Sequence, residues 1–105
     1  MNKTNIDYNH EERSLTITLK GEIDHHGAKG LREEIDKEIK KTTPKTLIMD
    51  MSAITFCDSS GLGLIMGRYK TVTEYGGELF IKSPAESAKK MILLSGMDRL
   101  IKITD

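Results

Sequence analysis

The feature that most constrains the fold is a short apolar run, Thr46–Met51 (TLIMDM), which lies between two segments with helical spacing. A nearly continuous run of this length is expected of a central strand that is covered on one or both faces. Upstream, Leu15, Ile17 and Leu19 alternate with polar residues, which is the pattern of a half-buried strand. These segments together predict a sheet with helices packed on it.

The first part of the chain predicts a hairpin followed by a helix. Ile6 and Tyr8 precede the polar turn Asn9–Arg13, so we expect a strand that pairs with the alternating segment. Residues 21–27 lead into a helix that ends before Pro44, with charged residues such as Asp36 on its outer face. Its apolar face is formed by Ala28, Leu31, Ile35 and Ile39.

The second half alternates helices with strands. A helix is expected over residues 60–75, where Tyr75-Gly76-Gly77 stops it, and a strand over Glu78–Lys82. Ser83-Pro84-Ala85-Glu86 combines a serine cap, a first-turn proline and a glutamate, and predicts a third helix that stops at Gly96. A last short strand is expected over residues 100–104. The order β-β-α-β-α-β-α-β predicts an α/β fold in which a hairpin precedes parallel strands joined by right-handed crossovers.

Composition narrows the functional classes. The 105 residues include 16 Lys plus Arg and 16 Asp plus Glu, so the formal net charge is zero with neutral histidines. That balance gives no electrostatic reason to expect nucleic acid or an anionic membrane as the main partner. No apolar run approaches the roughly 20 residues that span a bilayer, and a single cysteine, Cys57, fits a reducing cytoplasm. We therefore expect a cytoplasmic domain that binds neither nucleic acid nor membrane directly.

One stretch, Cys57–Lys70 (CDSSGLGLIMGRYK), places two serines and several glycines where the strand pattern becomes helical. The nucleophile elbow of hydrolases requires Gly-x-Ser-x-Gly, but position 57 is not glycine and all the histidines precede the serines. A Walker-type phosphate loop requires lysine after its last glycine, but Gly67 is followed by Arg68. Hydrolysis by one of these serines with His25 or His26, or nucleotide binding, is therefore an alternative with little motif support.

Helical spacing predicts which side of the 60–75 helix is buried. At about 100° per residue, one face collects the side chains expected to pack on the sheet, namely Leu62, Ile65, Met66, Tyr69 and Val72. Leu64 points to the opposite side, where a surface with little charge is formed by Ser60, Gly67, Thr71 and Tyr75. It is either an isolated exposed leucine, which needs no explanation, or the centre of a flat protein-binding patch.

Two polar segments are expected to begin helices. Asp58-Ser59-Ser60 can accept hydrogen bonds from the first-turn N–H groups, which leaves one of the serines free for another task. Asp24 is expected to cap the earlier helix, with His25 and His26 on the surface beyond it. We expect no metal site, because adjacent histidines do not share a helix face and no further ligand follows at suitable spacing. Cys57 is expected to be a buried residue at the end of a strand.

Two segments together, Leu19–Leu31 (LKGEIDHHGAKGL) and Phe56–Lys70 (FCDSSGLGLIMGRYK), resemble the STAS domain family, named for sulfate transporters and anti-sigma factor antagonists. The similarity is greatest to the sporulation-type antagonists, and it extends to Leu93–Ile103 (LLSGMDRLIKI). Cys57 departs from the Met or Ile that is common in the family. The resemblance implies a STAS-like mixed sheet, packed by about three to four helices, in a single domain over residues 1–105.

The resemblance also implies a regulatory protein with no catalytic residues and no cofactor. Ser59 matches the serine that an anti-sigma factor serine kinase phosphorylates in the family. The dephosphorylated antagonist binds that kinase and releases the sigma factor, and a serine phosphatase restores it after phosphorylation. A STAS regulatory module of another complex, in stress signalling or beside a transporter, is the alternative. The expected partner-binding residues are Asp24, His25, His26, Asp58, Ser60, Gly61, Leu62, Gly63, Leu64 and Gly67.

Overall fold

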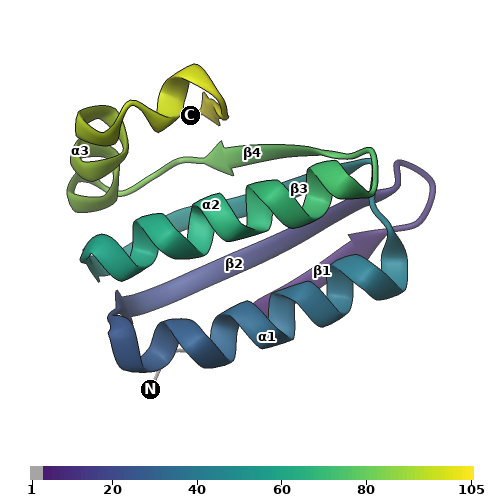
Figure 1. Cartoon of the computed structure of the whole chain (residues 1–105), viewed down its shortest axis with the longest axis horizontal. Helices are drawn as coiled ribbons and strands as arrows, with labels where there is room; N and C mark the ends of the chain where they lie inside the picture. Colours follow the sequence, from purple (N-terminus) through teal and green to yellow (C-terminus); the bar gives the residue numbers. More distant parts are fainter. Residues whose placement is uncertain (1–3) are drawn as a thin grey trace.

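The strands of the computed structural model form one five-stranded sheet in the order β1-β2-β3-β4-β5 (Figure 1). The structure describes residues 4–105, so the first three residues of the predicted domain lie outside the described residues. β1 pairs with β2 antiparallel, and the later neighbours are parallel. The elements are β1 (Asn5–Asn9), β2 (Ser14–Ile23), α1 (His25–Thr42), β3 (Thr46–Cys57), α2 (Ser59–Glu74), β4 (Glu78–Lys82), α3 (Glu86–Ser95), the 3₁₀ turn η1 (Met97–Arg99) and β5 (Lys102–Thr104). This order confirms the predicted mixed α/β fold.

The helices and the sheet form two layers, and α1 and α2 run side by side over one face of the strands (Figure 1). Each parallel connection moves one strand further in the same direction, so right-handed crossovers place the connecting helices on one face. Beneath them Leu15, Ile17 and Leu19 of β2 are buried, whereas the alternating Thr16 and Thr18 are partly exposed. The core therefore lies between the helices and one face of the sheet.

The apolar face predicted for α1 is confirmed. Leu31, Ile35 and Ile39 are buried and Ala28 is partly buried, and each fully buried aliphatic side chain contributes roughly 1.5–3 kcal/mol. The outer face is less uniform than predicted. Asp36 is partly buried because it pairs with a residue of α2, so it does not belong to the solvated charged surface.

β3 is twice as long as the predicted apolar run, because it continues through a polar stretch to Cys57. Its pairing with β2 shifts register twice, between Thr18 and Lys20 and between Gly21 and Glu22. At each shift β3 uses one extra residue, which is the definition of a bulge. The bulges change the spacing of buried residues from two to three, so Met51, Ile54 and Cys57 all reach the core. This is how the end of β3 comes to support the start of α2.

The predicted serine cap of the third helix is wrong. α3 begins at Glu86 with Ala85 as its N-cap, and no side chain caps it. Ser83 instead adopts a positive φ of 48° and donates its N–H to the carbonyl of Thr104 at 2.8 Å. Ala85 donates its N–H to the carbonyl of Met51 at 3.1 Å. These long-range bonds hold the segment extended, so tertiary contacts override the local capping signal. Gly96 does end the helix, in the left-handed conformation.

The predicted exposure of Leu64 is also wrong. Leu64 is 3% exposed, and the fully buried side of α2 consists of Gly61, Leu64, Ile65, Arg68 and Val72. The predicted inner residues Leu62, Met66 and Tyr69 are partly buried against the core. The difference arises because α2 packs on α1 as well as on the sheet, and α1 covers the side that carries Leu64. The centre of the patch predicted around Leu64 is therefore covered by a neighbouring helix, whereas Ser60, Gly67 and Thr71 stay partly exposed.

Candidate functional site

The two polar segments predicted to begin helices lie next to each other. Ile23 and Cys57 are the last paired residues of the parallel strands β2 and β3. The N–H of Asp58 donates to the carbonyl of Ile23 at 3.4 Å, which links the two chain segments directly after the strands end. Because Asp24 and Asp58 immediately follow these strands, α1 and α2 begin at the same edge of the sheet.

Each helix is capped by its predicted aspartate. Asp24 Oδ1 accepts from the N–H of Gly27 at 2.8 Å, and Asp58 Oδ1 accepts from the N–H of Ser60 at 2.8 Å. Both cap residues are extended, the backbone conformation that allows a side chain to reach the first turn. Two positive helix ends and two carboxylates therefore meet at one edge.

Ser59 occupies the first position of α2 and is exposed. Within residues 4–105 its hydroxyl forms no hydrogen bond, and the side-chain cap of α2 is supplied by Asp58 instead. Ser60 is partly exposed and supplies the N–H that Asp58 accepts. Of the two serines, Ser59 is therefore the one that takes no part in capping the helix.

The first turn of α2 is fixed from below by the end of β3. A Cβ on Gly61 would collide with the sulfur of Cys57, so only glycine fits against this side chain without movement. Cys57 is 5% exposed, as predicted for a buried residue at a strand end. Burial raises the pKa of its thiol, and the neighbouring charge of Asp58 raises it further. The thiol therefore packs against the first turn of α2 at Gly61.

A groove of about 440 Å³ separates the first turns of α1 and α2. His25, His26, Ala28, Lys29 and Arg32 line it from α1, and Ser60, Gly63 and Leu64 line it from α2. Lys29 and Arg32 are exposed and form no ion pair within residues 4–105. A Cβ on Gly63 would meet no atom within 4 Å, so the α2 side is open to an approaching chain.

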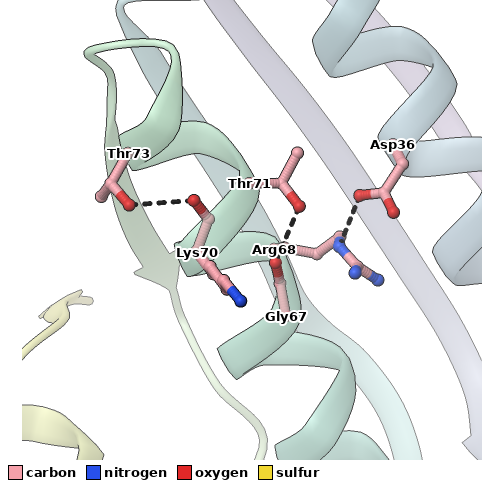
Figure 2. Close-up of polar contacts among 6 residues, drawn as sticks. All are labelled: Asp36, Gly67, Arg68, Lys70, Thr71 and Thr73. Carbon is pink, nitrogen blue, oxygen red and sulfur yellow. Dashed lines mark hydrogen bonds and ion pairs between the residues drawn. The ribbon is translucent and has the colours of Figure 1, made fainter.

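Further along the same helix pair, an ion pair between a buried arginine and a partly buried aspartate links α2 to α1. Figure 2 shows the guanidinium of Arg68 reaching from α2 toward the carboxylate of Asp36 on α1, with Nε 2.8 Å from Oδ1. Arg68 is 3% exposed, and in the described part of the chain its Nη1 has no hydrogen-bond partner. Burial lowers the pKa of Arg68, Asp36 opposes this effect, and the nearby charge of Arg32 adds to it.

The groove brings together half of the predicted partner-binding residues. His25, His26, Ser60, Gly63 and Leu64 line it, although Leu64 is buried. Asp24 borders a separate hollow of about 730 Å³ on the other side of α1. Asp58 and Gly61 support the start of α2, whereas Leu62 and Gly67 are partly exposed and lie outside the groove lining.

Sequence reasoning missed the basic residues of this surface. Arg32 belongs to the predicted charged outer face of this helix and Lys29 has no predicted role, yet both follow His25, at four and seven residues, the spacing of one helix face. Nothing in the sequence indicated that Arg68 is buried, because a charged residue is rarely buried unless it is paired. Among residues 4–105 no group of three or more histidine, cysteine or acidic residues is arranged to hold a metal ion. No helix in that range has the length and apolarity needed to cross a membrane.

Residues 5–105 match the model of the STAS domain. The chain belongs to the STAS domain family. The resemblance carried by the two segments around Asp24 and Ser59 is thereby confirmed. The five-stranded mixed sheet and its three helices are the STAS fold, and the site described above is formed by the first turns of two of those helices.

Among curated STAS relatives, the anti-sigma F factor antagonist of Paenibacillus polymyxa is 31% identical over 100 residues, which cover 95% of this chain and 86% of that protein. Among solved structures, the anti-sigma factor antagonist SpoIIAA in its unphosphorylated form is 25% identical with a TM-score of 0.83, over 98% of this chain and 89% of that one. The Bacillus cell fate determinant SpoIIAA in the phosphorylated form is also 25% identical, with a TM-score of 0.76 over 98% of this chain and 92% of that one. This STAS chain is thus similar to antagonists solved in both states.

Proposed function

We propose that this STAS protein is an anti-sigma factor antagonist that acts in the cytoplasm and is controlled by phosphorylation of Ser59. The dephosphorylated form binds an anti-sigma serine kinase and releases the sigma factor, and a serine phosphatase reverses the modification. The observation that carries the proposal is the environment of Ser59, which is exposed at the start of α2 and free of hydrogen bonds within residues 4–105. Such a hydroxyl is accessible to a kinase.

A phosphate on Ser59 is expected to leave the fold intact. The modification adds about −1.5 to −2 charges at neutral pH, and negative charge is favourable at a helix N-terminus. The cap is unaffected because Asp58, and not Ser59, accepts the first-turn hydrogen bond. Gly61 and Cys57 hold the next turn from below. Phosphorylation therefore changes the charge and shape of the surface with little change in the backbone.

A docked partner experiences the same modification differently. The phosphate adds bulk and charge at the point where α1 and α2 begin, and a partner must then desolvate it or move away. Asp24 and Asp58 already supply negative charge at this edge. The expected result is loss of kinase binding without unfolding of the antagonist.

Phosphorylation by the anti-sigma kinase of the same organism tests the proposal. After incubation with the kinase and ATP, mass spectrometry should locate one phosphate on Ser59. The variant Ser59→Ala should remain unmodified but still bind the kinase, whereas Ser59→Asp should bind weakly. Ser60→Ala distinguishes the two adjacent serines, and it should still receive its phosphate on Ser59. Full phosphorylation of Ser59→Ala would show that the site is assigned wrongly.

A hydrolase is the second candidate, because the groove brings Ser60 and both histidines to one surface. Nucleophilic catalysis uses a serine hydroxyl within hydrogen-bond reach of its base. Within residues 4–105, no hydrogen bond joins a serine hydroxyl to a histidine ring. An assay with activated esters distinguishes the two functions. Turnover that is lost in Ser60→Ala and in His25→Ala would favour the enzyme, whereas the antagonist should show no serine-dependent turnover.

A further inference from the structure

The groove between α1 and α2 carries two positive charges, Lys29 and Arg32, although the formal net charge of the chain is zero. His25, His26, Lys29 and Arg32 line it, and none of its lining residues in the described part of the chain is acidic. Lys29 and Arg32 project from one side of α1 as exposed side chains without ion pairs in residues 4–105. The α1 and α2 N-termini add positive potential, part of which the caps Asp24 and Asp58 offset.

Deeper between α1 and α2, the guanidinium of Arg68 is only partly paired with a carboxylate. Asp36 is the carboxylate paired with Arg68, yet its Oδ1 lies only near Nε, and Nη1 of Arg68 is buried without a hydrogen-bond partner in residues 4–105. Figure 2 shows the two terminal nitrogens of the guanidinium pointing away from this carboxylate. Arg32 is close enough to Arg68 to act on it electrostatically. The carboxylate of Asp36 therefore engages one edge of the Arg68 guanidinium, and the positive charge of Arg32 acts on that guanidinium from the groove side.

The shape of the groove allows a chain to reach these cations. Its volume is about 440 Å³, which is large enough for several side chains. Gly63 offers backbone with open space above it, and Leu64 supplies a buried apolar floor. A glycine on one wall and flexible basic side chains on the other are suited to an extended or helical segment that carries carboxylates.

We infer that this groove docks an acidic segment of the anti-sigma kinase, whose Asp or Glu carboxylates pair with Lys29 and Arg32. The inference rests on the proposed function and names the chemistry of the partner surface. It also gives phosphorylation a specific effect. Ser60 lines the groove, so a phosphate on the adjacent Ser59 places negative charge beside it, where it attracts the same cations and repels an acidic segment.

Charge reversal in the groove tests the inference against a matched control. In its dephosphorylated form, the double variant Lys29→Glu/Arg32→Glu should bind the anti-sigma kinase at least about tenfold more weakly than the dephosphorylated wild type. Lys37→Glu/Lys41→Glu changes net charge equally on the same helix, at exposed positions outside the groove, and should bind within about twofold of the wild type. Circular dichroism and thermal unfolding establish that both variants are folded.

A kinase that binds the wild type and the groove variant equally would overturn the inference and leave the proposed function standing. A kinase that binds neither the wild type nor Ser59→Ala would overturn the proposed function and, with it, this assignment of the partner. The salt dependence of binding gives a second readout, because pairing of exposed charges weakens as salt rises. The groove variant should lose most of the salt dependence that the wild type and the control show.

A peptide of six glutamates tests the chemistry of the groove without the kinase. Added to the ¹⁵N-labelled full chain, it should shift the amide resonances of Lys29, Arg32 and Gly63, and a peptide of six lysines should not. The shifts should disappear in Lys29→Glu/Arg32→Glu and persist in Lys37→Glu/Lys41→Glu. Glutamate-induced shifts that spread evenly over the basic surface, or that are absent, would contradict a defined acidic dock.

Discussion

The two helices that border the groove begin with the same pattern but are anchored differently. Asp24-His25-His26-Gly27 and Asp58-Ser59-Ser60-Gly61 each place an aspartate cap before two polar residues and a glycine. At α1 the cap is exposed and Gly27 is partly exposed. At α2 the cap is partly buried and Gly61 is buried against Cys57.

The start of α2 is therefore anchored on the core, whereas the start of α1 supplies the basic side chains of the groove. The start of α2 rests on the core, so Ser59 can gain a phosphate while the backbone below it stays in place. The start of α1 lies at the surface and carries His25, with Lys29 and Arg32 behind it, into the groove. The same local pattern thus presents a modifiable hydroxyl on one helix and basic side chains on the other.

The largest expected effect comes from Gly61→Ala, which adds a methyl group against the sulfur of Cys57. Overpacking of a buried site costs about 1–3 kcal/mol, and the better helix propensity of alanine offsets about 1 kcal/mol of this. We therefore expect a net loss of up to about 2 kcal/mol in the free energy of unfolding, measured by urea denaturation. A stability equal to or above that of the wild type would show that the start of α2 is not anchored through this contact.

The contact can be isolated by adding Cys57→Ala, which removes the sulfur that the new methyl group meets. The double variant should be at least as stable as Gly61→Ala alone, because each change relieves the defect that the other creates. Strictly additive losses in the two variants would mean that the glycine and the thiol do not interact.

The two caps provide the next largest effect. Asp58→Ala and Asp24→Ala each remove the acceptor of one first-turn N–H, and each should cost about 1 kcal/mol. We expect the greater loss at Asp58, which is the less exposed of the two. The conservative variants Asp58→Asn and Asp24→Asn should stay within a few tenths of a kcal/mol of the wild type, because asparagine caps comparably. Equal losses for alanine and asparagine would indicate a role other than capping.

A change of opposite sign is expected two residues after Gly61. Gly63→Ala meets no atom within 4 Å and lies inside α2, so it should stabilise the chain by about 0.5–1 kcal/mol through helix propensity. Thermal unfolding of Gly61→Ala and Gly63→Ala under the same conditions compares an anchored with an open glycine. A destabilised Gly63→Ala would mean that the groove wall is packed.

Sequence patterns predicted the parts of this structure that depend on near neighbours. The order of elements, the Asp24 and Asp58 caps and the inner face of α1 follow from periodicity and first-turn chemistry. Helical spacing failed for Leu64 because it assumes a single packing partner for α2. Since α1 covers a second side, the buried arc is wider than one stripe.

The basic groove could not be predicted for a related reason. Overall charge is zero, and Lys29 and Arg32 look like ordinary solvated residues until α2 is placed beside them. The Ser83 cap failed because bonds to Met51 and Thr104, far away in sequence, hold that segment extended. In each case the deciding contact joins elements that sequence proximity does not connect.

The smallest predicted effect is a pH dependence at the start of α2. Burial, followed by the charge of Asp58, raises the pKa of the Cys57 thiol in the folded chain. Ionisation therefore favours the unfolded state, so the contribution of this thiol to stability is complete below its unfolded pKa of about 8.5. It is lost as the pH rises through the higher folded pKa.

Relative to Cys57→Ala, the wild type should lose stability above about pH 8.5, in urea denaturation measured across this range. A stability difference between the two proteins that stays constant to high pH would show that the thiol ionises as easily in the fold as out of it. The start of α2 would then be no more secluded from water than that of α1.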